Sequence, residues 1–126
     1  MAKKILIVED EQETSAFLKN KLNQLNFHTE TSGDGGDAIN KMKTFMPDLV
    51  LLDIMLPVID GIEVLKWIKT NQPQVLVIMT TAKKEVSDLK TGYSLEADYY
   101  ITKPYTFEEI IKGINVLMSL KGDEVN

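Results

Sequence analysis

The sequence predicts an α/β protein with a five-stranded parallel sheet and helices on both faces. Short runs of β-branched residues and leucine alternate with longer stretches in which apolar residues recur every three or four positions. This alternation is typical of repeated strand and helix units, and five such units fit 126 residues. Most of the strand-like runs are continuously apolar, as expected of strands covered on both faces. We therefore expect one domain over residues 1–120, followed by a polar C-terminal tail over residues 121–126.

The five strands and the first four helices follow one another in regular order. The expected strands are residues 4–8, 27–31, 48–52, 75–79 and 99–102. Each helix is predicted from one apolar stripe. The first four stripes are Phe17, Leu18, Leu22 and Leu25; Ala38, Ile39, Met42 and Phe45; Ile62, Leu65 and Ile68; and Val86, Leu89 and Tyr93. Because the fourth stripe is thin, we expect the helix at residues 83–94 to be the least firmly held.

The last helix has the clearest pattern and a defined start. Its stripe consists of Phe107, Ile110, Ile111, Ile114, Leu117 and Met118. Thr106 and Glu109 have the spacing of a capping box, in which each side chain binds the backbone N–H of the other residue. We therefore expect this helix to begin directly after Thr106.

Composition excludes several classes of function. Nineteen acidic residues against 14 Lys and Arg give a net charge of −5, which repels nucleic acid phosphates, so no direct nucleic acid partner is expected. The absence of cysteine excludes a disulfide scaffold and a thiolate metal site. No apolar run approaches the ~18 residues that span a bilayer, so no membrane attachment is expected. We expect a cytoplasmic protein.

Polar residues directly follow four of the five predicted strands. In an open α/β sheet the carboxyl ends of the strands meet at one edge, where ligands bind. The residues at these positions are Glu9, Asp10 and Glu11; Asp53; Thr80 and Thr81; and Lys103. One edge of the sheet is therefore expected to carry carboxylates, hydroxyls and an ammonium.

Asp10 and Asp53 would repel each other at this edge unless a cation or Lys103 lay between them. Carboxylate oxygens without sulfur or imidazole ligands suit Mg²⁺, which takes one or two carboxylates together with water and phosphate oxygens. Glu11 has a simpler interpretation, because an acidic residue at the start of a helix is favoured by the helix dipole. Thr81 also has one, because β-branched residues often end strands.

Four segments resemble the receiver domain of two-component response regulators. They are residues 7–11, residues 53–61, the pair Thr81-Ala82 and residues 100–104, and they occur in the order expected of that family. The resemblance extends from about Lys3 to Leu120. It implies a flavodoxin-like fold with five helices and strand order 2-1-3-4-5.

The resemblance implies that Asp53 accepts a phosphoryl group. The donor would be the phosphohistidine of a sensor histidine kinase or of a histidine phosphotransfer protein. Thr81 and Lys103 would contact the phosphoryl oxygens and share the charge of the transferring group. An ionised carboxylate is nucleophilic without a separate base, which agrees with an aspartyl phosphate. The chain's one histidine, His28, is expected at the surface and is not needed for this reaction.

The resemblance also implies a Mg²⁺ site and a set of structural residues. Asp10, Asp53 and the backbone carbonyl of Met55 would hold the ion, and Glu9 would assist through water. The structural residues implied by the matching segments are Pro57, Gly61 in the turn into the third helix, and Pro104, which would follow a cis peptide bond.

Phosphorylation would change the output surface of such a receiver. In the family the hydroxyl at Thr81 moves toward the phosphoryl group and the aromatic ring at Tyr100 rotates inward. The face formed by the fourth helix, the fifth strand and the fifth helix then changes shape. The implied partners are a downstream effector protein, a covalent output domain absent from this chain, or a second copy in a phosphorylation-dependent homodimer.

We expect a phosphoacceptor signalling domain that catalyses its own phosphorylation and slow dephosphorylation, and is not otherwise an enzyme. Met55 and Lys83 stand two residues beyond Asp53 and Thr81, at positions that tune the phosphoryl lifetime in the family. A methionine side chain cannot position an attacking water by a strong hydrogen bond. The sequence therefore predicts a phosphoryl lifetime of many minutes or longer.

Other functions fit the sequence less well. A flavodoxin-like electron carrier needs a hydroxyl- and glycine-rich phosphate loop where this chain has residues 9–11, which are all acidic. A phosphatase of the haloacid dehalogenase type has a site that resembles Asp-x-Asp. Here Asp53 would be the first acid, and Met55 occupies the place of the second. The main alternative is an interaction module that keeps the receiver fold without being phosphorylated. The sequence does not distinguish a stand-alone regulator from a receiver excised from a longer DNA-binding protein.

Overall fold

The computed structural model describes residues 2–82 and 97–120, within which the strands and helices follow the predicted order. The strands are β1 (Lys4–Val8), β2 (His28–Ser32), β3 (Leu49–Asp53), β4 (Leu76–Ala82) and β5 (Tyr99–Lys103). The helices are α1 (Gln12–Gln24), α2 (Gly35–Phe45), α3 (Gly61–Asn71) and α5 (Phe107–Leu120). The helix predicted at residues 83–94 and the tail predicted at residues 121–126 lie outside the described residues.

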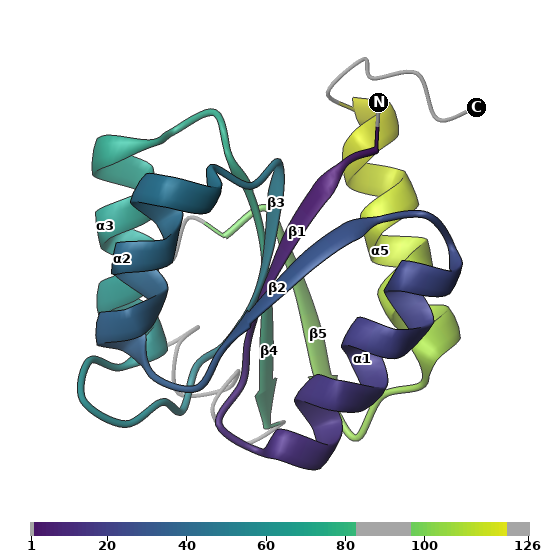
Figure 1. Ribbon diagram of the computed structural model, residues 1–126, viewed down its shortest axis with the longest axis horizontal. Coiled ribbons are helices and arrows are strands. Elements are labelled where there is room, and N and C mark those ends of the chain that lie inside the picture. Colours follow the sequence, from purple (N-terminus) through teal and green to yellow (C-terminus); the bar gives the residue numbers. More distant parts are fainter. Residues whose placement is uncertain (1, 83–96, 121–126) are drawn as a thin grey trace.

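The five strands form one parallel sheet in the order β2-β1-β3-β4-β5, which confirms the predicted topology. In the register of the sheet, Val8 lies opposite Leu52, and Asp53 lies opposite Thr80. Parallel pairing therefore brings the carboxyl ends of the central strands to one edge, shown at the arrowheads in Figure 1.

The strand ends differ slightly from the prediction. β3 includes Asp53 and β4 continues through Thr80 and Thr81 to Ala82, whereas the predicted strands ended at the last apolar residue. Backbone pairing does not require an apolar side chain, and these polar residues continue the ladder of the sheet. Asp53 is therefore held by a central strand and does not belong to the loop that follows it.

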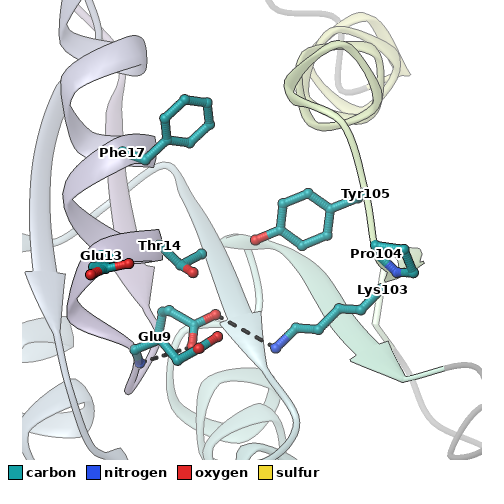
Figure 2. Close-up of a pocket in the computed structure, with 8 residues that line it drawn as sticks. Glu9, Glu13, Thr14, Phe17, Lys103, Pro104 and Tyr105 are labelled. Carbon is teal, nitrogen blue, oxygen red and sulfur yellow. Dashed lines mark hydrogen bonds and ion pairs between the residues drawn. The ribbon is translucent and has the colours of Figure 1, made fainter.

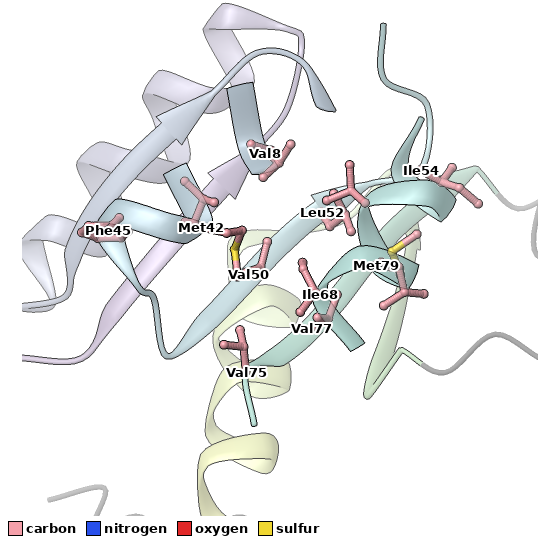
Figure 3. Packing of buried hydrophobic residues seen from close by; sticks show 14 residues of the cluster. Val8, Met42, Phe45, Val50, Leu52, Ile54, Ile68, Val75, Val77 and Met79 are labelled. Atoms are coloured by element: carbon pink, nitrogen blue, oxygen red, sulfur yellow. The ribbon is translucent and has the colours of Figure 1, made fainter. Parts of the chain in front are cut away.

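The helices cover the sheet on both faces. Figure 1 shows α2 and α3 on one face and α1 and α5 on the other. The first face is packed with Leu6, Val8, Val50, Leu52, Val77 and Met79 of the strands against Ala38, Met42, Val64, Leu65 and Ile68 of the helices (Figure 3). The second is packed with Ile5, Ile7, Leu49, Leu51 and Ile78 against Leu18, Leu22, Ile110, Ile114 and Leu117. Alternate residues of each central strand therefore enter opposite halves of the core.

The apolar stripe predicted for α1 is only partly buried. Leu18 and Leu22 are buried, but Phe17 is 50% exposed and Leu25 is 51% exposed. Leu25 lies at the C-cap, beyond the last full turn of the helix. Phe17 points toward the boundary with α5, where its ring meets that of Phe107 edge to face at a centroid distance of 6.2 Å. The prediction that these two residues join the core was therefore wrong.

The predicted capping box at the start of α5 is confirmed. The backbone N–H of Glu109 donates to Thr106 Oγ1 at 3.2 Å, and the backbone N–H of Thr106 donates to Glu109 Oε1 at 3.2 Å. Both side chains therefore satisfy backbone donors that the first turn leaves without helical partners.

Across the two described segments, no helix combines the length and the apolar character needed to cross a membrane.

Candidate functional site

Three carboxylates converge at the carboxyl edge of the sheet. Glu9 and Asp10 follow β1, and Asp53 ends β3. One carboxylate oxygen from each lies within 4.8 Å of the others. Glu9 and Asp53 are 4% and 3% exposed, whereas Asp10 is exposed. The strand-end rule therefore correctly predicted that Asp10 and Asp53 meet.

Lys103 partly neutralises this acidic cluster. Its Nζ donates to Asp53 Oδ2 at 3.0 Å and lies 3.6 Å from Glu9 Oε1. Figure 2 shows the lysine reaching across from β5 toward Glu9. Within the described residues, Lys103 is the lysine that forms ion pairs with members of the acidic cluster. Two of the three carboxylates thus share one ammonium, and the excess negative charge of the cluster favours a further cation.

Backbone N–H groups orient the two buried carboxylates. Met55 donates its N–H to Asp53 Oδ1 at 3.1 Å, and Glu11 donates its N–H to Glu9 Oε2 at 3.1 Å. Gly61 starts α3 directly behind this point, where an added Cβ would lie 2.3 Å from the backbone oxygen of Asp53. Only glycine therefore lets α3 begin so close to the end of β3.

Burial and charge shift the pKa values of the groups around this cluster. Burial raises the pKa of Glu9 to about 7; the N–H of Glu11 opposes this shift and the charge on Asp53 adds to it. Burial lowers the pKa of Lys103, but the hydrogen bond and charge of Asp53 together with the charge of Glu9 raise it overall. Lys103 therefore stays protonated at neutral pH, while Glu9 is near its midpoint.

The remaining predicted site residues surround the cluster. Thr81 is fully buried one residue beyond Thr80, the partner of Asp53 in the sheet, and its hydroxyl donates to the Ala82 carbonyl at 3.3 Å. The Lys103–Pro104 peptide bond is cis. Pro57 is exposed in the loop after Asp53.

The two tyrosines of β5 have different surroundings. Tyr100 is 38% exposed, and burial of its remaining surface raises its pKa. Tyr99 packs against the α5 side of the core, where a Cβ added at Gly113 would lie 3.1 Å from its ring. Tyr100 is therefore the tyrosine with space to change its position. Lys83, which was also predicted to affect the site, lies outside the described residues.

A cavity of about 590 Å³ opens beside Lys103, between the start of α1 and the β5–α5 connection. Its lining residues are Glu9, Glu11, Glu13, Thr14, Phe17, Lys103, Pro104 and Tyr105 (Figure 2). Burial, together with the charge on Glu9, raises the pKa of Tyr105 to about 12, so its hydroxyl stays protonated. Tyr105 is not among the predicted site residues, although its position two residues after Lys103 places it at the same edge.

His28 lies away from this site. It is exposed at the first residue of β2, where its ring meets the Phe45 ring edge to face at 5.4 Å. The amino ends of the strands are opposite to the edge that carries the acidic cluster. The prediction of a surface histidine is confirmed.

Known proteins share both this fold and long stretches of this sequence. The chain is 38% identical over 94% of its length to the alkaline phosphatase synthesis transcriptional regulatory protein PhoP of Bacillus subtilis, covering 49% of that protein. It is 39% identical over 90% of its length to the response regulator ArlR of Staphylococcus aureus, covering 52%. The CheY-like receiver domain protein of Methanospirillum hungatei superposes with a TM-score of 0.84 at 27% identity, covering 97% of this chain and 98% of that one.

The sheet order and the edge cluster define a CheY-like domain with a flavodoxin fold. The response regulator receiver domain model matches residues 5–115, and the chain belongs to that family. It spans about half the length of the curated relatives that it matches.

Proposed function

We propose that Asp53 accepts a phosphoryl group from the phosphohistidine of a sensor histidine kinase or of a histidine phosphotransfer protein. The environment of the Asp53 carboxylate is the observation that supports this most. The group is buried, one oxygen is bound by the Lys103 ammonium, and two further carboxylates lie within 4.8 Å. Such a carboxylate is a nucleophile at neutral pH without a separate base.

Mg²⁺ fits the donors at this edge. Glu9, Asp10 and Asp53 offer oxygen ligands, and they carry more negative charge than Lys103 neutralises. We expect Asp10, Asp53 and the Met55 carbonyl to hold the ion directly, and Glu9 to contribute through water. When bound, the ion would neutralise part of the charge on the transferred group.

In the transfer step an oxygen–phosphorus bond forms as a nitrogen–phosphorus bond breaks. A carboxylate oxygen of Asp53 attacks phosphorus, and the electron pair of the broken bond stays on the donor imidazole nitrogen. Lys103 Nζ, 3.0 Å from Asp53 Oδ2, would bind an oxygen of the incoming group, as would the hydroxyl of Thr81. The chain thus catalyses its own phosphorylation.

Phosphorylation would add about −1.5 to −2 charge to an edge that is already acidic. We expect Thr81 to move toward the phosphoryl group and Tyr100 to rotate inward. These movements would change the face formed by β5, α5 and the helix predicted at residues 83–94. The partner at this face would be a downstream effector, a second copy of the chain, or a covalent output domain. In the longer relatives, the half that this chain does not cover would correspond to such a domain.

The aspartyl phosphate is expected to last many minutes. Met55 is 63% exposed beside Asp53, and its thioether cannot hold an attacking water by a strong hydrogen bond. Met55→Asn would shorten the lifetime. Met46→Asn is the matched control, because Met46 is also exposed, at 58%, and lies at the C-cap of α2. A lifetime of seconds that neither substitution changes would contradict this account.

Intact mass after incubation with Mg²⁺ and acetyl phosphate tests the proposed function. We expect a gain of one phosphoryl group that disappears in Asp53→Asn and in the presence of EDTA. Asp98→Asn, which alters a carboxylate remote from the cluster, should still be phosphorylated. No gain in a folded chain that binds Mg²⁺ would favour the phosphorylation-independent interaction module.

A further inference from the structure

The loop at residues 54–60, between β3 and α3, is held by the first turn of α2. The carbonyl of Pro57 accepts two backbone N–H groups, from Ile59 at 2.9 Å and from Gly35 at 3.3 Å. The second bond joins the loop to the first residue of α2, which is distant in the sequence. Pro57 O is therefore the point at which α2 attaches to the loop.

Gly35 allows this attachment because it has no side chain. A Cβ added there would lie 1.9 Å from the backbone oxygen of Ile59 and 2.7 Å from its carbonyl carbon. These are backbone atoms, so the clash cannot be relieved by a rotamer change. A Cβ at the neighbouring Gly36 would meet no backbone atom so closely: it would lie 3.3 Å from Asp34 Oδ1, which would have to shift by a few tenths of an ångström, and in ordinary contact with Val58 Cγ1 at 3.5 Å.

The same attachment holds Val58 in a conformation that valine rarely adopts. Its φ is 72°, in the left-handed region that β-branched residues avoid. Its side chain is 82% exposed, so core packing does not impose this conformation. The constraint that the structure shows is the pair of hydrogen bonds that Pro57 O accepts from Ile59 and Gly35. Residues held in rarely populated backbone conformations are often found near functional sites.

The loop is directly connected to the Asp53 carboxylate. Met55 N–H donates to Asp53 Oδ1 at 3.1 Å. Ile54 is fixed on two sides, donating its N–H to Thr80 O at 3.1 Å and accepting the N–H of Gly61 at 2.9 Å. Because these bonds fix both ends of the loop, a displacement near Ile59 is confined to residues 55–60, a short span that includes Met55. A shift there would rotate the carboxylate away from its bond with Lys103.

We propose that Gly35 is a positioning residue, through which α2 holds the 54–60 loop in the conformation that orients Asp53 and thereby sets the affinity for Mg²⁺. This inference rests on the proposed function, because it takes the acidic cluster to be a Mg²⁺ site. It assigns a role in ion binding to a residue of α2 that supplies no ligand. Its effect passes through Pro57, Ile59 and Met55 to the carboxylate.

Calorimetric titration of Mg²⁺ into the metal-free protein tests the proposal. Gly35→Ala should weaken binding by about tenfold, as is typical when a group supporting a metal ligand is displaced. Gly36→Ala, one residue further along the same turn, should remain within about twofold of the wild type. In metal-free samples, the amide NMR signals of Met55 and Ile59 should shift in Gly35→Ala and stay in place in Gly36→Ala.

A second variant decides the matter if Gly35→Ala does not fold. Ser32 is buried, and its single hydroxyl hydrogen is shared between Asp37 Oδ2 at 2.8 Å and the Asp34 carbonyl at 3.0 Å, which ties the start of α2 to β2. Ser32→Ala loosens this turn without a clash and without a change of charge. It should weaken Mg²⁺ binding by about threefold, a smaller loss than displacement of the loop itself.

The outcomes separate this inference from the proposed function. A wild-type chain that binds no Mg²⁺ would overturn both. A wild-type chain that binds Mg²⁺, with a folded Gly35→Ala variant of equal affinity, would overturn the positioning role alone. If only Ser32→Ala folds, unchanged affinity in that variant would also overturn it.

Discussion

Two aspartate–lysine ion pairs in the described part of the chain join separate elements, one at each end of the sheet. At the carboxyl end, Lys103 Nζ lies 3.0 Å from Asp53 Oδ2. At the amino end, Lys69 Nζ of α3 lies 2.8 Å from Asp98 Oδ2, just before β5. The two contacts have nearly the same length and chemistry, but the surroundings of the carboxylates differ.

The Asp98 carboxylate is satisfied by the protein itself. Asp98 Oδ2 also accepts the backbone N–H of Val77 at 2.8 Å, and the Asp98 N–H donates to the Val77 carbonyl at 3.0 Å. Asp53 instead shares its lysine with Glu9 and lies beside Asp10, in the one cluster of three or more metal-ligating side chains found among the described residues. The Asp98 pair is satisfied within the fold, whereas the Asp53 pair belongs to an acidic cluster that could hold a metal ion.

The largest expected effect is that substitutions of the two aspartates change the free energy of unfolding in opposite directions. In EDTA, Asp98→Asn should lower the free energy of unfolding by about 2 kcal/mol, because charge-assisted hydrogen bonds to Lys69 and Val77 are weakened. Asp53→Asn should raise it by about 1 kcal/mol, because a buried carboxylate is removed from its like-charged neighbours. Urea unfolding measures both. Destabilisation by both substitutions would remove the distinction.

The pH dependence of stability is a second test of the difference between the two ends of the sheet, because Glu9 of the acidic cluster has a raised pKa. Its pKa in the folded, metal-free chain is raised from 4.5 to about 7 by burial, so the folded state holds a proton that the unfolded state has released. This contribution is fully present below pH 4.5 and is lost as pH rises through about 7. The loss should be about 2 kcal/mol after allowance for solvent screening.

Urea unfolding in EDTA at several pH values measures this loss. Glu9→Gln removes the titrating group, so its stability relative to wild type should rise between pH 5 and pH 8 by the amount that wild type loses. A constant difference between the two chains over this range would show that Glu9 is ionised throughout.

Mg²⁺ should raise the free energy of unfolding by binding the carboxyl-edge cluster, and this effect should not depend on Asp98 at the other end of the sheet. At a concentration ten times the dissociation constant, a ligand that binds only the folded state contributes about 1.4 kcal/mol. We expect this increase in wild type and in Asp98→Asn, and its absence in Asp10→Asn and Asp53→Asn. Thermal unfolding with and without Mg²⁺ provides the measurement, and equal stabilisation of all four chains would place the ion elsewhere.

The smallest expected change in stability is that of Lys69, and the two lysines should differ in their effect on phosphorylation. Lys69→Met should lower the free energy of unfolding by about 1 kcal/mol, because its ion pair with Asp98 is partly exposed to solvent. It should leave phosphorylation by acetyl phosphate unchanged. Lys103→Met should abolish that phosphorylation, because the ammonium beside Asp53 is lost. Equal rates of phosphorylation in the two variants would show that Lys103 has no special role.

The sequence predicts the carboxyl-edge cluster better than it predicts the loops around it. Asp10, Asp53 and Lys103 each follow an apolar run, and parallel pairing forces the ends of such runs together whatever the loops do. The attachment of Gly35 to Pro57 has no comparable signal, because it depends on backbone atoms brought together only by the packing of α2 beside α3. The exposure of Phe17 also depends on a neighbouring helix, so helical spacing alone predicted it wrongly.

The position of β3 has a consequence for how this chain would exchange with solvent. All five of its residues are buried, and it is paired on both sides, with β1 and β4. Its amide hydrogens should therefore exchange only when the whole domain unfolds, while those of exposed loops exchange through local opening. Asp53 is the last residue of this strand. The proposed acceptor group would thus be attached to the part of the backbone that opens last, and a signal that it received would be transmitted by the side chains and loops around it.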